Sequence, residues 1–126
     1  MAFPGTYNFS YYRGDTFEFN IYPKNAAGQP FVLDSYNVAF TISNTRGSEG
    51  VTTQVTSYAV ISPDNTYITC VILPEDGAQL SADATYVYDV EIRDTDALPY
   101  PKIYTLLTGT IDVTDQVTDI QAGGSS

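Results

Sequence analysis

Apolar and polar side chains alternate with a period of two along most of this chain, the pattern of a β-strand that buries one face. In residues 15–22, for example, Phe17, Phe19 and Ile21 fall on one face and polar side chains on the other. Residues 67–73 are almost continuously apolar and β-branched, as expected of a strand covered on both faces. The alternation predicts about seven strands, over residues 6–12, 15–22, 36–43, 51–61, 66–73, 85–93 and 102–113.

Turn-forming residues separate these strands. Two prolines within residues 94–101 prevent the strand over 85–93 from continuing, because proline has no N–H to donate to a ladder. A proline at residue 74 favours a short helical turn near 74–80. Gly109 interrupts the last strand, where a glycine often marks a bulge or bend. The spacing predicts an all-β fold, specifically an antiparallel immunoglobulin-like β-sandwich. We expect one domain over residues 1–118 and a flexible C-terminal tail over 119–126.

The charge balance is strongly acidic, with 15 acidic and 5 basic residues and a net charge of −10. Repulsion from phosphates predicts that the protein binds neither nucleic acid nor anionic membranes. No apolar run approaches the about 20 residues that span a bilayer, and the first residues lack the pattern of a signal peptide. We therefore expect synthesis in a cytoplasm. The single cysteine, Cys70, allows no internal disulfide, so we expect the stability of the fold to come from burial of apolar side chains.

Residues for catalysis are scarce. The chain has no histidine, which removes the usual general base and the commonest metal ligand. Asp89 and Glu91 form a candidate hydrolase pair, but they also fit the outward polar face of an alternating strand. Asp94 and Asp96 could offer oxygens to calcium, yet aspartate is common in turns. We expect no enzymatic activity, no cofactor and no metal, and we expect Cys70 to be a buried, inert core residue.

Tyrosine is in surplus, with 11 tyrosines beside 6 phenylalanines. A domain of this size cannot bury all of them, so some should form an apolar surface patch that meets a partner protein or a sugar. The candidate interface residues are Tyr11, Tyr12, Tyr100 and Tyr104. The alternative is that such rings stack over edge strands without a partner.

The tripeptide Arg13-Gly14-Asp15 has two interpretations. It is the sequence by which many extracellular ligands bind adhesion receptors, and that use requires an exposed loop tip. It also lies between two aromatic strands, where glycine tolerates positive φ and aspartate bonds nearby backbone groups. Turn chemistry alone explains these residues, so a structural reversal that aims Phe17 inward is the favoured interpretation.

The order of several motifs resembles a family of small β-sandwich domains in virion proteins of tailed phages. The motifs are "RGDTFEFNIY", "PFVLDSYNVAFTI", "YITCVILPEDGAQL", "TYVYDVEIRD" and "YTLLTGTIDVTDQVT", which together cover about residues 7 to 118. Members occur in baseplate upper proteins, in tail-fibre and head-fibre proteins and as minor structural proteins. The loop over residues 44–50 lacks a family signature, and no fibre shaft or receptor-binding domain is expected.

The resemblance implies a non-enzymatic structural or adaptor protein of a phage particle, made in the bacterial cytoplasm. Its partners would be other virion proteins, including further copies of itself, reached through aromatic surface and strand edges. Three alternatives stay open from the residues alone. They are a carbohydrate-binding or host-surface-binding module that uses exposed rings, a hydrolase that uses Asp89 and Glu91, and a receptor ligand that uses Arg13-Gly14-Asp15.

Overall fold

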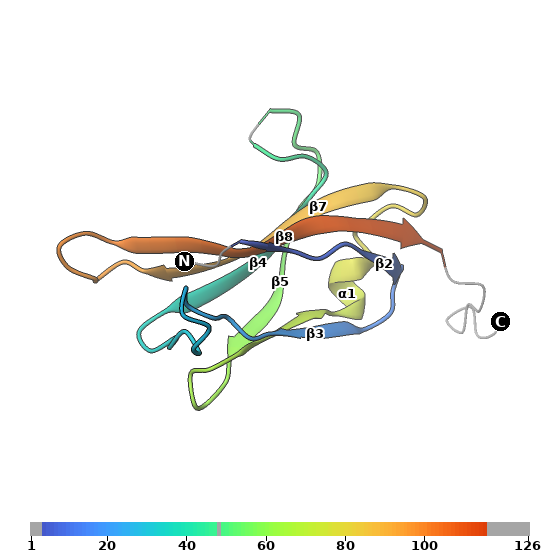
Figure 1. The fold of residues 1–126 in the computed structure, drawn as a ribbon. Coiled ribbons are helices and arrows are strands. Elements are labelled where there is room, and N and C mark those ends of the chain that lie inside the picture. Colours follow the sequence, from blue (N-terminus) through green and yellow to red (C-terminus); the bar gives the residue numbers. More distant parts are fainter. Residues whose placement is uncertain (1–3, 48, 116–126) are drawn as a thin grey trace.

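A single path of hydrogen-bonded strands curls back on itself, as shown by a computed structural model that describes residues 4–47 and 49–115 (Figure 1). Its elements are β1 (Gly5–Thr6), β2 (Phe9–Tyr12), β3 (Phe17–Ile21), β4 (Asn37–Ser43), β5 (Gln54–Ile61), β6 (Ile68–Ile72), α1 (Pro74–Gly77), β7 (Thr85–Asp94) and β8 (Lys102–Thr114). The pairing order is β1-β8-β7-β4-β5-β6-β3, and β2 also pairs with β8.

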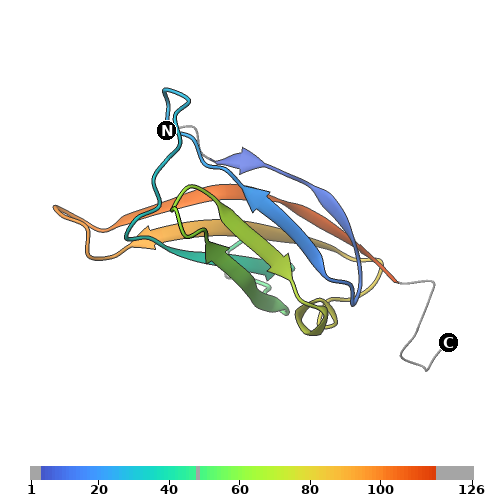
Figure 2. The same ribbon diagram turned by 90° about the horizontal axis from the view of Figure 1, so that it is seen from below.

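Strand β5 belongs to two layers. Its first half pairs with β4, with Ser57 opposite Phe40, and its second half pairs with β6, with Tyr58 opposite Val71. One layer therefore holds β1, β2, β8, β7 and β4, and the other holds β6 and β3 (Figure 2). The buried Ser57 hydroxyl lies 2.7 Å from the Val71 carbonyl oxygen and 3.1 Å from Oδ2 of Asp76 at this corner. These contacts satisfy a polar group that would be costly to bury alone.

The core lies between the two layers and follows the predicted alternation. On β3, Phe17, Phe19 and Ile21 face inward while the polar residues between them are exposed. Burial raises the pKa of the Cys70 thiol to about 12, so this core cysteine stays protonated and inert, as predicted. The largest fully buried side chains are Tyr11, Tyr88, Phe40, Leu33, Ile42, Ile68, Ile72, Leu80, Ile92, Ile111, Val90 and Cys70.

The all-β fold is as predicted, but the expected purely antiparallel arrangement is wrong at the N-terminus. The predicted strand 6–12 is divided into β1 and β2, and both run parallel to β8, with Gly5 opposite Leu107 and Phe9 opposite Ile111. The reason is that the chain leaves β2 for the other layer, so β2 pairs with the last strand instead of with β3. The sheet is consequently mixed. Helix α1 occupies only the first part of the predicted turn, and the predicted tail over 119–126 lies outside the described residues.

Gly109 permits a close approach of the segment that separates β1 from β2. A Cβ atom at this position would overlap the carbonyl oxygen of Tyr7. That carbonyl points into the core and accepts a 2.5 Å hydrogen bond from the Tyr88 hydroxyl. The side-chain amide oxygen of Asn8 replaces a backbone acceptor at this point of the ladder and accepts a 3.0 Å hydrogen bond from the Thr110 N–H. Both backbone groups of Tyr7 are thus hydrogen-bonded, since its N–H also donates to the Thr108 carbonyl oxygen at 3.0 Å.

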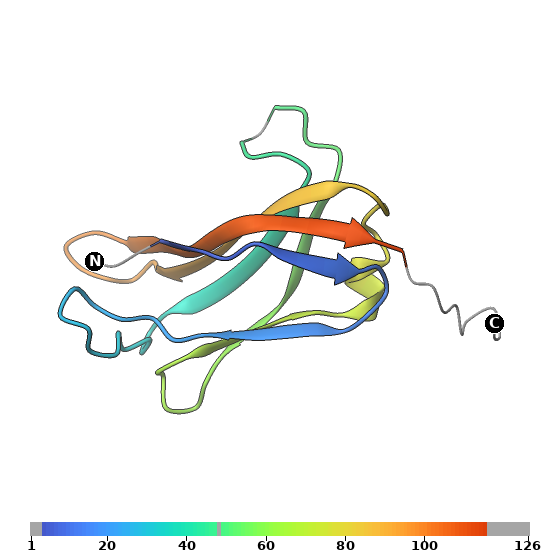
Figure 3. The same ribbon diagram turned by 45° about the vertical axis from the view of Figure 1, so that its right-hand side comes forward.

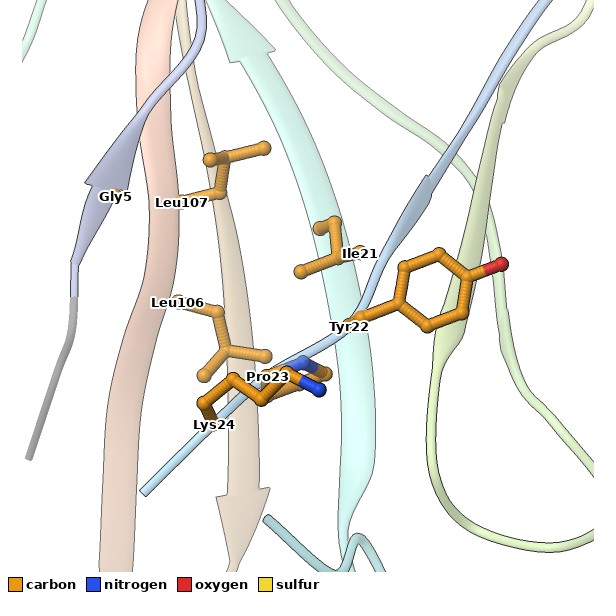
Figure 4. Close-up of a pocket in the computed structure, with 7 residues that line it drawn as sticks. All are labelled: Gly5, Ile21, Tyr22, Pro23, Lys24, Leu106 and Leu107. Atoms are coloured by element: carbon orange, nitrogen blue, oxygen red, sulfur yellow. The ribbon is translucent and has the colours of Figure 1, made fainter. Parts of the chain in front are cut away.

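Gly109 therefore does not form the expected bulge or bend; its role is to let the Tyr7 backbone approach. The register between β7 and β8 shifts at Leu106, three residues before Gly109. Val90 is opposite Leu107, whereas Glu91 is opposite Thr105. Leu106 is the extra residue of this bulge. Its side chain is buried, and that of Leu107 is partly buried on the same side of the strand (Figure 4). The bulge thus directs two consecutive leucines toward β3.

We predict that Gly109→Ala lowers the free energy of unfolding by about 1–3 kcal/mol, because the new methyl group must displace the backbone at Tyr7. Chemical denaturation of the purified protein measures this change. Gly5→Ala is the matched control, since a Cβ there would lie 3.5 Å from Cδ1 of Leu107, an ordinary contact. Equal stability of the two variants would contradict the close approach at Gly109.

Candidate interaction site

The four tyrosines predicted as interface residues have different environments. Tyr11 is only 1% exposed, and its hydroxyl donates a 2.6 Å hydrogen bond to the carbonyl oxygen of Asp15. Its ring also fills the space that a Cβ at Gly77 would need. The expectation that Tyr11 is a surface residue is therefore wrong. Its position on β2 turns the ring inward, and the glycine of α1 makes room for it.

Tyr12 and Tyr100 are exposed, at 54% and 65%, as the interface hypothesis requires. They lie far apart, at the end of β2 and in the β7–β8 hairpin, which are opposite ends of the molecule in Figure 1. Tyr104 is partly buried and contacts the rings of Phe31 and Tyr36, with centroids 6.1 and 6.3 Å away. The structure therefore does not gather the four tyrosines into one patch.

Arg13-Gly14-Asp15 forms the reversal expected from its turn chemistry. Gly14 has φ = 90°, and the Asp15 N–H donates to the Tyr12 carbonyl oxygen at 3.0 Å. The Arg13 side chain folds back onto the protein, where Nε donates to the Leu80 carbonyl oxygen at 2.8 Å and Nη1 lies 3.5 Å from Asp115. An arginine held in this way is poorly suited to receptor binding through a protruding loop tip.

This reversal places β2 and β3 in different layers, and aromatic rings hold the two strands together. The rings of Phe9 and Phe17 stack with centroids 4.4 Å apart and planes 11° apart. Tyr7 contacts Phe19 edge-on, with centroids 5.6 Å apart. Among the described residues, β3 pairs only with β6, and β2 only with β8. The seam between the two strands is therefore closed by side chains rather than by backbone hydrogen bonds.

The seam widens away from the turn, where β1 and β3 diverge (Figure 3). Here an open apolar groove lies between β1 and β8 on one side and the end of β3 on the other (Figure 4). Two adjoining cavities of about 220 and about 420 Å³ form it. We call it the seam groove, and its lining residues are Gly5, Tyr7, Phe19, Asn20, Ile21, Tyr22, Pro23, Lys24, Leu106 and Leu107.

Each part of the seam groove has a local cause. Gly5 adds no side chain, so the space beside Leu107 stays open. The bulge at Leu106 turns two leucines into the groove, and Ile21 contributes the last inward side chain of β3. Tyr22 is 58% exposed at the rim, where its ring lies 5.3 Å from that of Tyr67. Backbone of β1 and β3 borders both sides.

Sequence analysis missed this groove. The parallel return of β1 along β8 brings Gly5 and the two leucines together, although they are about 100 positions apart in the sequence. Local periodicity carries no information on that pairing. The one available signal was the Leu106-Leu107 pair, which breaks the alternation of the last strand as a bulge does.

The candidate carboxylate pair is occupied by ion pairs. Asp89 accepts a 2.7 Å hydrogen bond from Nη1 of Arg46, and Glu91 accepts one of 2.7 Å from Nε of Arg93. Both carboxylates lie on the outer face of β7, which matches the polar half of an alternating strand. Over residues 4–47 and 49–115, no group of three or more acidic, cysteine or histidine side chains is arranged to hold a metal.

No protein-family model matches the chain, and no curated protein matches it. Within the described part of the chain, no helix has the length and apolar character needed to cross a membrane.

We predict that Arg13→Ala lowers the free energy of unfolding by about 1–2 kcal/mol, because the Leu80 carbonyl loses a charged donor. Denaturant titration measures the loss. Arg93→Ala is the control, since its exposed pair with Glu91 on the same strand is worth about 0–1 kcal/mol. If both variants were equally stable, the Arg13 side chain would not anchor the turn, and the receptor-ligand interpretation would regain support.

Proposed function

We propose that this protein is a non-enzymatic structural or adaptor component of a tailed-phage virion, which docks on other virion proteins through strand edges and apolar surface. The phage context is supported by the order of motifs in the sequence. The docking role is supported by one observation above all: β1 and β3, each with one edge unpaired among residues 4–47 and 49–115, flank an apolar groove that opens to solvent. Such edges are sites where a further strand can pair.

We also propose that the curled sheet is a variant of the immunoglobulin-like sandwich. The neighbour orders β3-β6-β5 and β4-β7-β8 correspond to the B-E-D and C-F-G strands of that fold. Tyr86, the second residue of β7, supports the same assignment. Its hydroxyl accepts a 2.8 Å hydrogen bond from the Ser81 N–H, five residues upstream, as in the tyrosine corner of immunoglobulin-like domains.

A glycan-binding or host-surface-binding module is the second candidate. It is favoured by the exposed Tyr22, which lies against Tyr67 with ring planes 32° apart and could stack on a sugar. A sugar also needs several hydrogen-bonding side chains, whereas the groove beside Tyr22 is mostly apolar. A docking protein segment therefore suits this surface better than a glycan.

The docking role in a virion predicts that the protein is present at fixed stoichiometry in purified particles of the phage that encodes it. Quantitative mass spectrometry of gradient-purified particles, scaled to the major capsid protein, measures the copy number. A constant ratio across independent preparations is the expected result, because docked subunits occupy defined sites. Its absence from particles, with abundant protein in the infected-cell lysate, would contradict the proposal.

A further inference from the structure

Backbone forms the rims of the seam groove, and the β3 rim is unpaired over its whole length among the described residues. Within the described chain, β3 forms a ladder with β6 alone, from Phe17 opposite Ile72 to Ile21 opposite Ile68. In an antiparallel pair, alternate residues direct their N–H and C=O groups away from the partner strand. The free edge of β3 therefore presents hydrogen-bonding groups in a row beside the apolar surface of Ile21 and Leu107.

We infer that the seam groove binds an extended, positively charged strand of a partner protein, which adds to the free edge of β3 and places alternate apolar side chains in the groove. The role as a docking protein proposed above is the basis of this inference, and the new element is the chemistry of the partner segment. Strand addition of this kind takes affinity from main-chain hydrogen bonds and specificity from pockets for alternate side chains.

The groove suits a peptide better than a sugar or a small polar ligand. Its lining offers few side-chain hydrogen-bonding groups, and one of these is already used, since the Asn20 amide oxygen accepts a 2.8 Å hydrogen bond from the Thr69 hydroxyl. Apolar side chains at every second position would fill the space over Leu106 and Leu107, while the strand backbone would satisfy the edge.

Charge complementarity favours a basic segment. Glu18 lies on the outer face of β3, is exposed, and has no ion pair among the described residues. A lysine or arginine on the outer face of an added strand would lie about 5 Å from it. A second copy of this chain is disfavoured, because two molecules with a net charge of −10 repel each other. Lys24 lines the far end of the groove and would repel a positive charge there. The basic residues of the partner segment should therefore lie toward Glu18.

The experiment titrates the full-length protein with synthetic peptides of about six residues, the usual length of a strand. One peptide alternates valine and lysine, and a second alternates valine and glutamate. The third is the lysine peptide with every second lysine replaced by proline, which lacks the N–H that strand pairing needs. Backbone amide chemical shifts locate binding, and oligosaccharides form a separate arm. We expect the lysine peptide to shift the amides of β3 and Leu107, to bind at least about tenfold more tightly than the other two, and to weaken as salt screens Glu18.

Two pairs of variants test the location. Gly5→Leu fills the groove in a place that has room for a side chain, so it should keep its stability and lose at least about tenfold in affinity, while Gly5→Ala binds normally. Tyr22→Ser should weaken binding, whereas Tyr58→Ser, a change at a similarly exposed tyrosine on β5, should not. Normal binding by a folded Gly5→Leu protein, shifts centred on another surface, or equal binding of the glutamate peptide would overturn the inference.

The outcomes separate this inference from the proposed function. Peptide binding in the groove, without the protein in particles, would uphold the groove and reject the virion role. Fixed stoichiometry in particles, without peptide binding, would uphold the role and reject the groove as the docking site. Saturable oligosaccharide binding that is lost in Gly5→Leu, with none of the peptides bound, would replace the strand by a glycan.

Discussion

The contact between β2 and β3 without backbone pairing is the constraint on which the rest of the structure depends. Consecutive strands joined by a tight turn usually form a hairpin, but here the turn at Arg13-Gly14-Asp15 sends the second strand into the other layer. The stacked rings of Phe9 and Phe17 replace the missing ladder. Offset ring contacts contribute about 0.5–1.5 kcal/mol each beyond area burial, so a series of them can hold two strands together.

This constraint leaves β2 free to pair with the last strand, and the parallel ladder follows. The kink between β1 and β2 fits against β8 only because Gly109 lacks a side chain and Tyr88 donates to the Tyr7 carbonyl. Burial raises the pKa of the Tyr88 hydroxyl strongly, so the phenol stays protonated and remains a donor at neutral pH. The opening at the other end of the seam arises where the aromatic contacts end and Gly5 supplies no side chain.

Sequence patterns predicted what depends on neighbours along the chain. Alternation located Phe17 and Phe19 on one face of β3, and turn chemistry gave the reversal at Gly14. The patterns failed where distant segments decide the outcome. Tyr11 was predicted to be a surface residue, but Gly77 makes room for its ring in the core. The parallel pairing of Gly5 with Leu107 has no local signature in the sequence. The fold class was therefore predictable, whereas the strand order and the seam groove were not.

The central claim is that, within the described chain, the edge of β3 along the seam carries no backbone pairing. Native-state amide hydrogen exchange tests it directly, because amides that face a partner strand are protected and those that face solvent exchange quickly. The account predicts protection at every second residue from Phe17 to Ile21, beside continuous protection in β8 from Leu107 to Asp112, which has neighbours on both sides. Continuous protection along β3 in dilute protein would contradict the account, since it would mean that this edge is already paired.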